Sequence, residues 1–328
     1  EIFEKAEKLT IESSVKVSGE LKEDVRAPNG FEVSVSEMEI IQIADPFPIT
    51  EHQSPELLYD NRHLWIRSRK INAVLKIRHT IVGAIHNFFR GRGYYEFDAP
   101  IFQPSQSEGG ATLFEVKYFD DIMYLSQTWQ LYAEAGIFSL GKIYNMGPTF
   151  RAEKSKTSRH LAEFWMVEPE IAFADLNDDA DLAEDFLKSI IHVLLNECEE
   201  DLALFNQHVS KGLIERLTKV AESEFVRMDY TDAIDLLGKS KQKFEYPVKW
   251  GLDMQSEHER YLCEKHVNGP LIVMNYPEDI KAFYMRRNDD GKTCAAMDIL
   301  VPGIGEIIGG SQREERLDVL DEKMNDDK

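Results

Sequence analysis

The sequence predicts an α+β fold in which β-hairpins and amphipathic helices share one chain of 328 residues. Apolar and polar residues alternate on both sides of a polar loop within residues 147–173, which is the pattern of an antiparallel hairpin. Apolar residues three or four positions apart between Ile71 and Arg90 predict an amphipathic helix, and Leu271 to Met274 indicates a buried strand. Strands and long helices in one chain therefore predict a mixed sheet with flanking helices.

Composition limits the class of protein. A hydrophobic fraction of 43% allows a substantial core, enough for one large domain with an appendage or for two domains. No apolar stretch approaches the ~20 residues of a membrane span, and no signal peptide is evident. Cys198, Cys263 and Cys294 lack metal-ligand spacing, so we expect reduced thiols in a cytoplasmic protein.

The net charge of -21 argues against a general nucleic-acid-binding protein, because phosphate contacts require Lys and Arg. It does not exclude a tRNA partner that meets local basic patches. The candidates are two clusters, Arg67, Arg69 and Lys70, and Lys154, Lys156 and Arg159. For the first cluster, ordinary solvated surface is an equally good explanation.

At the N-terminal end, residues 1–45 are expected to form part of a small β domain, with two alternating strands around a turn at 27–30. Residues 46–66 begin with Pro46 and Pro48 directly after Asp45, and these two prolines indicate a hinge. Residues 67–328 are expected to form the main domain, beginning with the helix described above.

The remaining elements follow in order along the main domain. After the helix to Arg90, a strand is expected to end at Pro100, followed by a loop rich in small residues and by a strand that leads into a helix near Gln130. We expect one acidic amphipathic helix over Asp178–Leu204 and a second helix carrying His258 in a structural role. A helical acidic tail follows Arg316.

The hairpin carries the residue types of a nucleotide site. Arg151, Glu153, His160 and Phe164 can converge on one pocket. A guanidinium group suits a phosphate oxygen, an aromatic face suits a base, and an acid can accept from an amino group. The alternative is a basic, solvated loop with an ordinary core phenylalanine.

The combination resembles a known motif. The pattern F-R-x-E, a loop and R-H-x-x-x-F from Phe150 to Phe164 is similar to motif 2 of the class II aminoacyl-tRNA synthetases. The continuation FWMVEPE resembles the asparaginyl members of the subgroup shared with the aspartyl and lysyl enzymes. The resemblance implies a mixed, mainly antiparallel sheet flanked by helices, with residues 1–45 as the C-terminal part of an OB-fold anticodon-binding domain. No anticodon-reading residue can be named in that part.

The resemblance also implies two substrate sites. The ATP site would comprise Arg151, Glu153, Arg159, His160 and Phe164, with Arg151 in the catalytic role at the α-phosphate. The amino-acid site would comprise Glu108, Gln127, Gln130, Glu168, Glu170, Tyr284 and Arg313, with Arg313 on the α-carboxylate.

A metal site is the third implication. Glu306 and Asp298 flank a turn, and two hard carboxylates beside a polyphosphate suit Mg²⁺. Loop acids are usually only solvated, and it is the match to the E-I-I-G-G-S-Q-R motif of the subgroup that favours a metal role. The implied cofactors are therefore ATP and Mg²⁺.

Charge distinguishes between amino acids. The aspartyl relatives carry a lysine at the position of Ala133, whereas this pocket would hold Glu168 and Glu170, which repel a side-chain carboxylate and accept from an amide. Asparagine and tRNA(Asn) are therefore the expected substrates. Two alternatives stay open: an asparagine synthetase that uses aspartate and ammonia, and a non-catalytic dimeric paralogue.

Two further expectations come from the resemblance. The segment Ile71–Pro100 resembles motif 1 and implies a homodimer. The glycine-rich motif 3, with its ATP-binding arginine, has no counterpart before Lys328, so we expect this sequence by itself to activate amino acid poorly.

Overall fold

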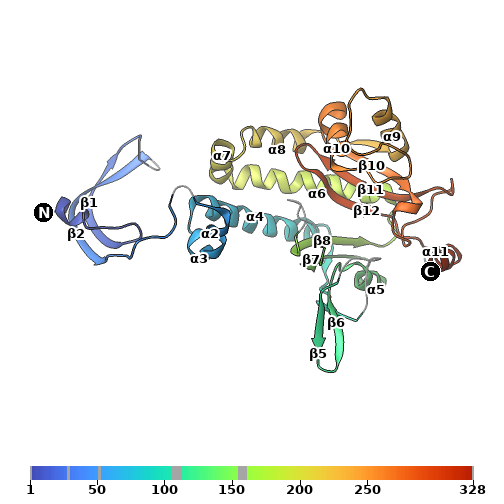
Figure 1. Cartoon of the computed structure of the whole chain (residues 1–328), viewed down its shortest axis with the longest axis horizontal. Helices are drawn as coiled ribbons and strands as arrows, with labels where there is room; N and C mark the ends of the chain where they lie inside the picture. Colours follow the sequence, from blue (N-terminus) through green and yellow to red (C-terminus); the bar gives the residue numbers. More distant parts are fainter. Residues whose placement is uncertain (1, 28–29, 51–52, 105–112, 154–160, 327–328) are drawn as a thin grey trace. The chain divides into compact units, whose positions relative to one another are not determined.

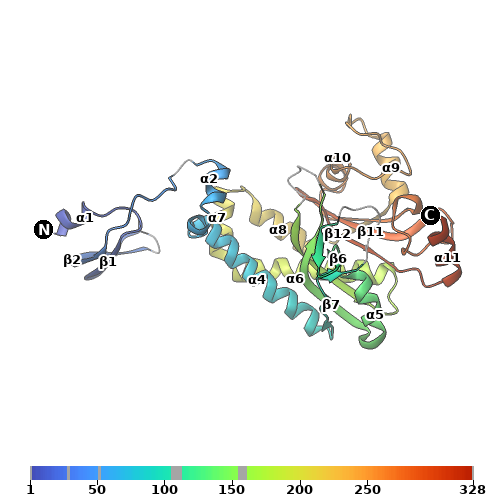
Figure 2. The ribbon, with the colours of Figure 1, turned by 60° about the horizontal axis from the view of Figure 1, so that its bottom comes forward.

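The computed structural model describes residues 2–27, 30–50, 53–104, 113–153 and 161–326. The chain divides into two compact units, Glu1–Val74 and Leu75–Lys328. This division falls within the long helix α4 (Arg69–Gly91). The expected domain boundaries at 45 and 66 stay predictions. Figures 1 and 2 show the chain from two directions.

The N-terminal unit is built on one hairpin. Strands β1 (Ser14–Glu23) and β2 (Phe31–Gln42) pair antiparallel, as the alternation predicted. The register shifts at Gly19, where a Cβ would lie only 2.2 Å from the carbonyl oxygen of Ser34. Helix α1 (Ile2–Ala6) precedes the hairpin, and α2 (Pro55–Asp60) and α3 (Arg62–Trp65) follow it. The assignment to an OB-fold stays a prediction.

A four-stranded sheet forms the centre of the second unit. Its order is β12-β11-β10-β9, with bounds β9 (Val226–Asp229), β10 (Leu271–Pro277), β11 (Thr293–Val301) and β12 (Gly305–Ser311). Only β9 and β10 pair in parallel; the other pairs are antiparallel. The buried strand predicted at 271–274 is confirmed within β10.

A second sheet carries the predicted hairpin. Strands β7 (Lys142–Phe150) and β8 (Glu163–Ile171) pair antiparallel, which confirms the prediction for residues 147–173. Strand β3 (Tyr95–Glu96) adds to β7 in parallel. The third sheet, β4-β6-β5, comprises β4 (Phe102–Gln103), β5 (Glu115–Tyr118) and β6 (Asp121–Leu125), and its β5–β6 hairpin projects from the unit in Figure 1.

The strand expected to run to Pro100 is shorter than predicted. After β3, one further bond joins the Phe97 N–H to the Tyr144 carbonyl, at 3.0 Å. Pro100 has no N–H to donate to β7, and the chain then leaves that strand to pair with β6. Alternation alone could not show this change of partner.

Helices cover both faces of the four-stranded sheet. Because alternate residues of a strand face opposite sides, Ile272 packs with α6 (Leu176–Glu197), and Val273 packs on the other side with α9 (Tyr230–Lys239). Both views show α6 running beside β11 and β12. The other helical segments are α5 (Gln130–Leu140), α7 (Glu199–His208), α8 (Leu213–Glu222), α10 (Ser256–Arg260), the π-helix η2 (Tyr261–Val267), the 3₁₀ turn η3 (Glu278–Ile280) and α11 (Leu317–Asp326).

The single helix predicted over Asp178–Leu204 is wrong. The chain breaks at Cys198, whose backbone (φ -119°, ψ 30°) is not helical, so that α6 ends and α7 begins there. His258 has the structural role that was predicted: it is 1% exposed, and its Nδ1 accepts from the Gln255 N–H at 3.1 Å. The three cysteines are buried and unpaired. Within the described ranges, no helix is long and apolar enough to span a membrane.

Candidate active site

The site begins on one face of strand β8. Phe164, Glu168 and Glu170 lie at even positions of this strand and therefore share a face. The guanidinium carbon of Arg151 lies 5.5 Å from the centre of the Phe164 ring, and the Arg151 N–H donates to the Ala162 carbonyl at 3.1 Å. The structure thus brings together the cation and the aromatic ring expected to hold a nucleotide. Glu153 is exposed beyond Arg151, and Arg159 and His160 lie outside the described residues.

Glu168 holds the start of helix α5. Its carboxylate accepts from the Trp129 N–H at 3.1 Å and from the Thr128 hydroxyl group. An acid at the beginning of a helix satisfies a backbone donor that has no partner within the helix. Glu168, which was predicted to contact the amino acid, is therefore engaged in joining α5 to β8.

Arg313 is the centre of the second half of the site. Its guanidinium group donates to Glu170, its Nε lies 3.3 Å from Oε1 of Glu134, and its Cζ lies 5.2 Å from the centre of the Tyr284 ring. Burial by itself would lower the pKa of Arg313, but Glu170 outweighs this effect and raises it. Burial raises the pKa of Glu170, and Arg313 opposes that rise. Arg313 thus contacts two other residues predicted for the amino-acid pocket, Glu170 and Tyr284.

Glu134 is a pocket residue that the sequence reasoning missed. Its Oε1 accepts from the Gln130 side-chain amide at 3.1 Å as well as lying beside Arg313. Helical spacing could have predicted it. Residues four apart on a helix share a face, and Gln130 had already been assigned to the pocket. Ala133, the neighbouring residue used for the charge argument, is 0% exposed and packs with Trp129 and Ile143 in the core.

Asp179 is a second acid that was missed. It lies on α6, and a Cβ at Gly310 would come within 2.4 Å of its Oδ2, so a side chain at position 310 would displace the Asp179 carboxylate. Burial raises the pKa of Asp179 to about 6, against the opposing effect of Arg313. No sequence pattern pointed to Asp179, because it stands within an acidic run that is typical of a solvated face.

Gln127 is buried, with an exposure of 2%, and among the described residues no hydrogen-bond partner reaches either atom of its amide. A buried amide without partners is costly, about 1–3 kcal/mol for each group. Its burial next to Thr128 fits a side chain that completes its hydrogen bonds with a ligand. Glu108, which was also predicted for the amino-acid site, lies outside the described residues.

The candidate metal ligands converge at Gly309. A Cβ on Gly309 would lie 3.4 Å from Oδ1 of Asp298 and 3.4 Å from Oε1 of Glu306, so both carboxylates border the same point. The Lys281 ammonium also reaches Asp298, at 3.1 Å. No cluster of three or more His, Cys, Asp or Glu side chains suited to a metal occurs in the part of the chain that the structure describes. Two carboxylates fit Mg²⁺, which retains waters and binds substrate phosphates.

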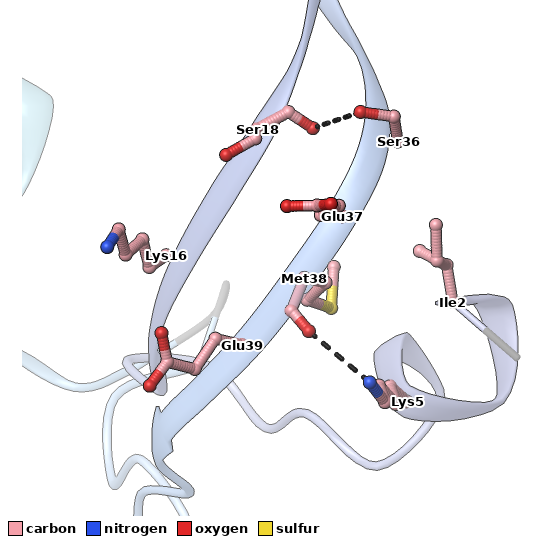
Figure 3. A pocket seen from close by; sticks show the side chains of 8 residues that line it. All are labelled: Ile2, Lys5, Lys16, Ser18, Ser36, Glu37, Met38 and Glu39. Carbon is pink, nitrogen blue, oxygen red and sulfur yellow. Dashed lines mark hydrogen bonds between the residues drawn. The ribbon is translucent and has the colours of Figure 1, made fainter.

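A pocket of about 740 Å³ lies in the N-terminal unit, away from these residues in the chain. Ile2 and Lys5 of α1 face Ser18, Ser36 and the nearby strand residues across it (Figure 3), and Lys5 donates to the Met38 carbonyl at 3.5 Å. Its lining residues are mostly exposed and of mixed charge. The pocket has none of the residues implied in activation, and we assign it no part in that chemistry.

Comparison with known proteins gives a consistent result. The family described as "tRNA synthetases class II (D, K and N)" matches residues 54–328. Asparagine–tRNA ligases of Myxococcus xanthus and Vibrio vulnificus are each 48% identical to this chain, over 96% and 97% of it and 73% of their own length. The crystal structure of asparaginyl-tRNA synthetase from Pyrococcus horikoshii complexed with asparaginyl-adenylate superposes with a TM-score of 0.89, at 42% identity, over 99% of this chain and 74% of that one.

Proposed function

The chain belongs to the class II tRNA synthetases of the D, K and N group and, within them, to the asparagine–tRNA ligases, and we propose that it activates L-asparagine with ATP and transfers it to tRNA(Asn). The observation that carries the choice of amino acid is the contact between Arg313 and Glu134.

A guanidinium beside a carboxylate is complementary to a primary amide. Arg313 donates to an amide oxygen, and Glu134 accepts from the NH₂ group, so asparagine satisfies both. Aspartate would place a third carboxylate beside those of Glu134 and Glu170, at a cost of several kcal/mol in a desolvated site. We therefore propose that Arg313 binds the side-chain amide of the substrate, whereas the sequence resemblance implied the α-carboxylate.

Activation needs no protein nucleophile, because the substrate carboxylate is already ionised. One carboxylate oxygen forms a bond to the α-phosphorus, the bond from that phosphorus to the bridging oxygen of pyrophosphate breaks, and pyrophosphate leaves with its electron pair. Arg151 holds the α-phosphate, Phe164 stacks on adenine beside Glu153, and Arg159 and His160 bind the outer phosphates. Catalysis then comes from alignment and charge stabilisation.

Mg²⁺ would be held by Glu306, with Asp298 beside it, and would neutralise charge on the phosphates. Gln127 and Gln130 would complete the amino-acid site, and Glu108 would receive the α-ammonium group. Glu168 supports this pocket through its bonds at the start of α5.

We also propose that the protein is a homodimer in the cytoplasm, joined through Ile71–Pro100. Leu75 and Tyr95 support this, since these apolar side chains are 48% and 59% exposed in that region. The N-terminal hairpin would belong to an OB-fold that contacts the anticodon. Sedimentation of the folded protein as a monomer at micromolar concentration would count against the dimer.

The test of the proposed function is asparagine-dependent ATP–pyrophosphate exchange, followed by charging of tRNA(Asn). In a protein that also carries motif 3, we expect exchange with asparagine and at least ~10²-fold less efficient exchange with aspartate. The present sequence by itself is expected to support exchange only poorly. Arg151→Ala should abolish exchange, whereas Arg62→Ala, at an exposed arginine of α3, should not. Release of free asparagine from aspartate, ammonia and ATP would instead identify an asparagine synthetase, and failure to bind either amino acid would favour a non-catalytic paralogue.

A further inference from the structure

Lys281 forms an ion pair with Asp298, one of the two proposed metal ligands. Its Nζ lies 3.1 Å from Oδ2 and 3.5 Å from Oδ1, so one ammonium group contacts both oxygens of the carboxylate. The two side chains are only 18% and 15% exposed. A pair so far removed from water is less screened than an ordinary surface pair.

The surroundings fix the ammonium group in this place. Nζ lies 4.0 Å from the centre of the Tyr276 ring, and that tyrosine is 2% exposed on β10. A cation held over an aromatic face is stabilised by the ring in addition to the carboxylate. The backbone is held as well, because the Lys281 N–H donates to the Glu278 carbonyl at 3.1 Å at the end of η3. Lys281 is therefore a positioned group and not a mobile surface lysine.

Carboxylate oxygens of Glu306 and Asp298 both lie beside Gly309, as described above. Because Lys281 contacts Asp298, it lies at the edge of the proposed metal site. A unit positive charge within contact distance of one ligand carboxylate repels a divalent cation and competes for the same oxygens. We infer that Lys281 is a built-in counter-ion of Asp298 that competes with Mg²⁺ for this carboxylate and lowers the affinity of the nucleotide-free protein for divalent cations.

This inference rests on the proposed metal site at Glu306 and Asp298. It adds that Asp298 is neutralised by the protein itself when no nucleotide is present. Metal then binds mainly as a complex with ATP, whose phosphates supply the additional oxygen ligands that Mg²⁺ prefers.

The test is direct binding of Mn²⁺ to the nucleotide-free protein, followed by the loss of the electron paramagnetic resonance signal of free Mn²⁺. Lys281→Met should bind Mn²⁺ roughly tenfold more tightly than wild type, because one repulsive charge is removed. Lys281→Arg keeps the charge and should stay close to wild type. Lys292→Met, at an exposed lysine of the same segment, changes the net charge equally and should have no effect.

The double variant Lys281→Met with Asp298→Asn should lose the gain, because the affected carboxylate is then absent. If Lys281→Met does not fold, as judged by circular dichroism, Lys281→Gln carries the same expectation. Mn²⁺ affinity equal to or weaker than wild type in the folded neutral variant, including no binding at all, overturns the inference. Asparagine-dependent exchange tests the proposed function separately, so failure of one is not mistaken for failure of the other.

Discussion

Oε1 of Glu134 lies 3.3 Å from Nε of Arg313, and this contact joins helix α5 to the segment that follows strand β12. The two side chains come from positions 179 residues apart, and each has a further partner, Gln130 for Glu134 and Glu170 for Arg313. In the proposed function, this donor and acceptor held side by side distinguish an amide from a carboxylate.

Glu134→Gln should weaken asparagine binding by roughly 10- to 100-fold, because it removes a charged acceptor from the substrate NH₂ group. The affinity for ATP should not change. Isothermal calorimetry with each ligand measures both quantities without relying on turnover. Glu200→Gln, at an exposed acid of α7, is the matched control and should leave both affinities unchanged. An unaltered asparagine affinity in Glu134→Gln would remove Glu134 from the pocket.

Ala133→Lys should act on folding before it acts on specificity. Ala133 is 0% exposed and packs with Trp129 and Ile143, so a lysine must bury its ammonium group or displace the helix. We expect the free energy of unfolding to fall by several kcal/mol in urea titrations. Ala135→Lys places the same side chain on the exposed face of α5 and should cost little. Equal stability of the two variants would show that position 133 opens toward the pocket.

The local sequence pattern was enough to predict the main strands and the long helix of this part of the fold. Alternation predicted the β7–β8 hairpin, and apolar spacing predicted α4. Contacts between distant segments were beyond its reach. Asp179 approaches Gly310 only because α6 packs on β12, and Lys281 reaches Asp298 only because η3 lies beside β11. Nor could periodicity show that Glu168 is used to hold the start of α5, since that contact depends on the geometry of a turn.

Asp179 should make stability depend on pH in a defined window. Its pKa rises from 3.8 to about 6 on folding because it is buried, so between these values the folded chain holds a proton that the unfolded chain has released. The free energy of unfolding therefore falls as pH rises through this window, by at most about 3 kcal/mol, and stays lower above it.

Asp179→Asn removes this pH dependence, because asparagine does not titrate. The melting temperature of the variant minus that of wild type should therefore be larger at about pH 7 than at about pH 4. Asp120→Asn, at an exposed aspartate of the β5–β6 turn, should track wild type at both values. A difference between Asp179→Asn and wild type that is the same at every pH would show that Asp179 titrates normally.

Glu168 and Thr128 should be coupled in stability, because the Thr128 hydroxyl group donates to the Glu168 carboxylate, which also accepts from the Trp129 N–H. We expect Glu168→Gln and Thr128→Val each to lower the free energy of unfolding by about 1–3 kcal/mol, since each weakens or removes a hydrogen bond to a charged carboxylate. The double variant should lose less than the sum of the two, by about 1 kcal/mol or more, because the second change removes a contact that is already broken. Urea unfolding of all four proteins measures this coupling.

A parallel double-mutant cycle provides the control. Glu163→Gln, at an exposed acid at the start of β8, should be additive with Thr128→Val. If Glu168→Gln instead retains full stability and only weakens asparagine binding, then the carboxylate serves the substrate directly, as the sequence resemblance implied, and its bonds at the start of α5 contribute little to folding.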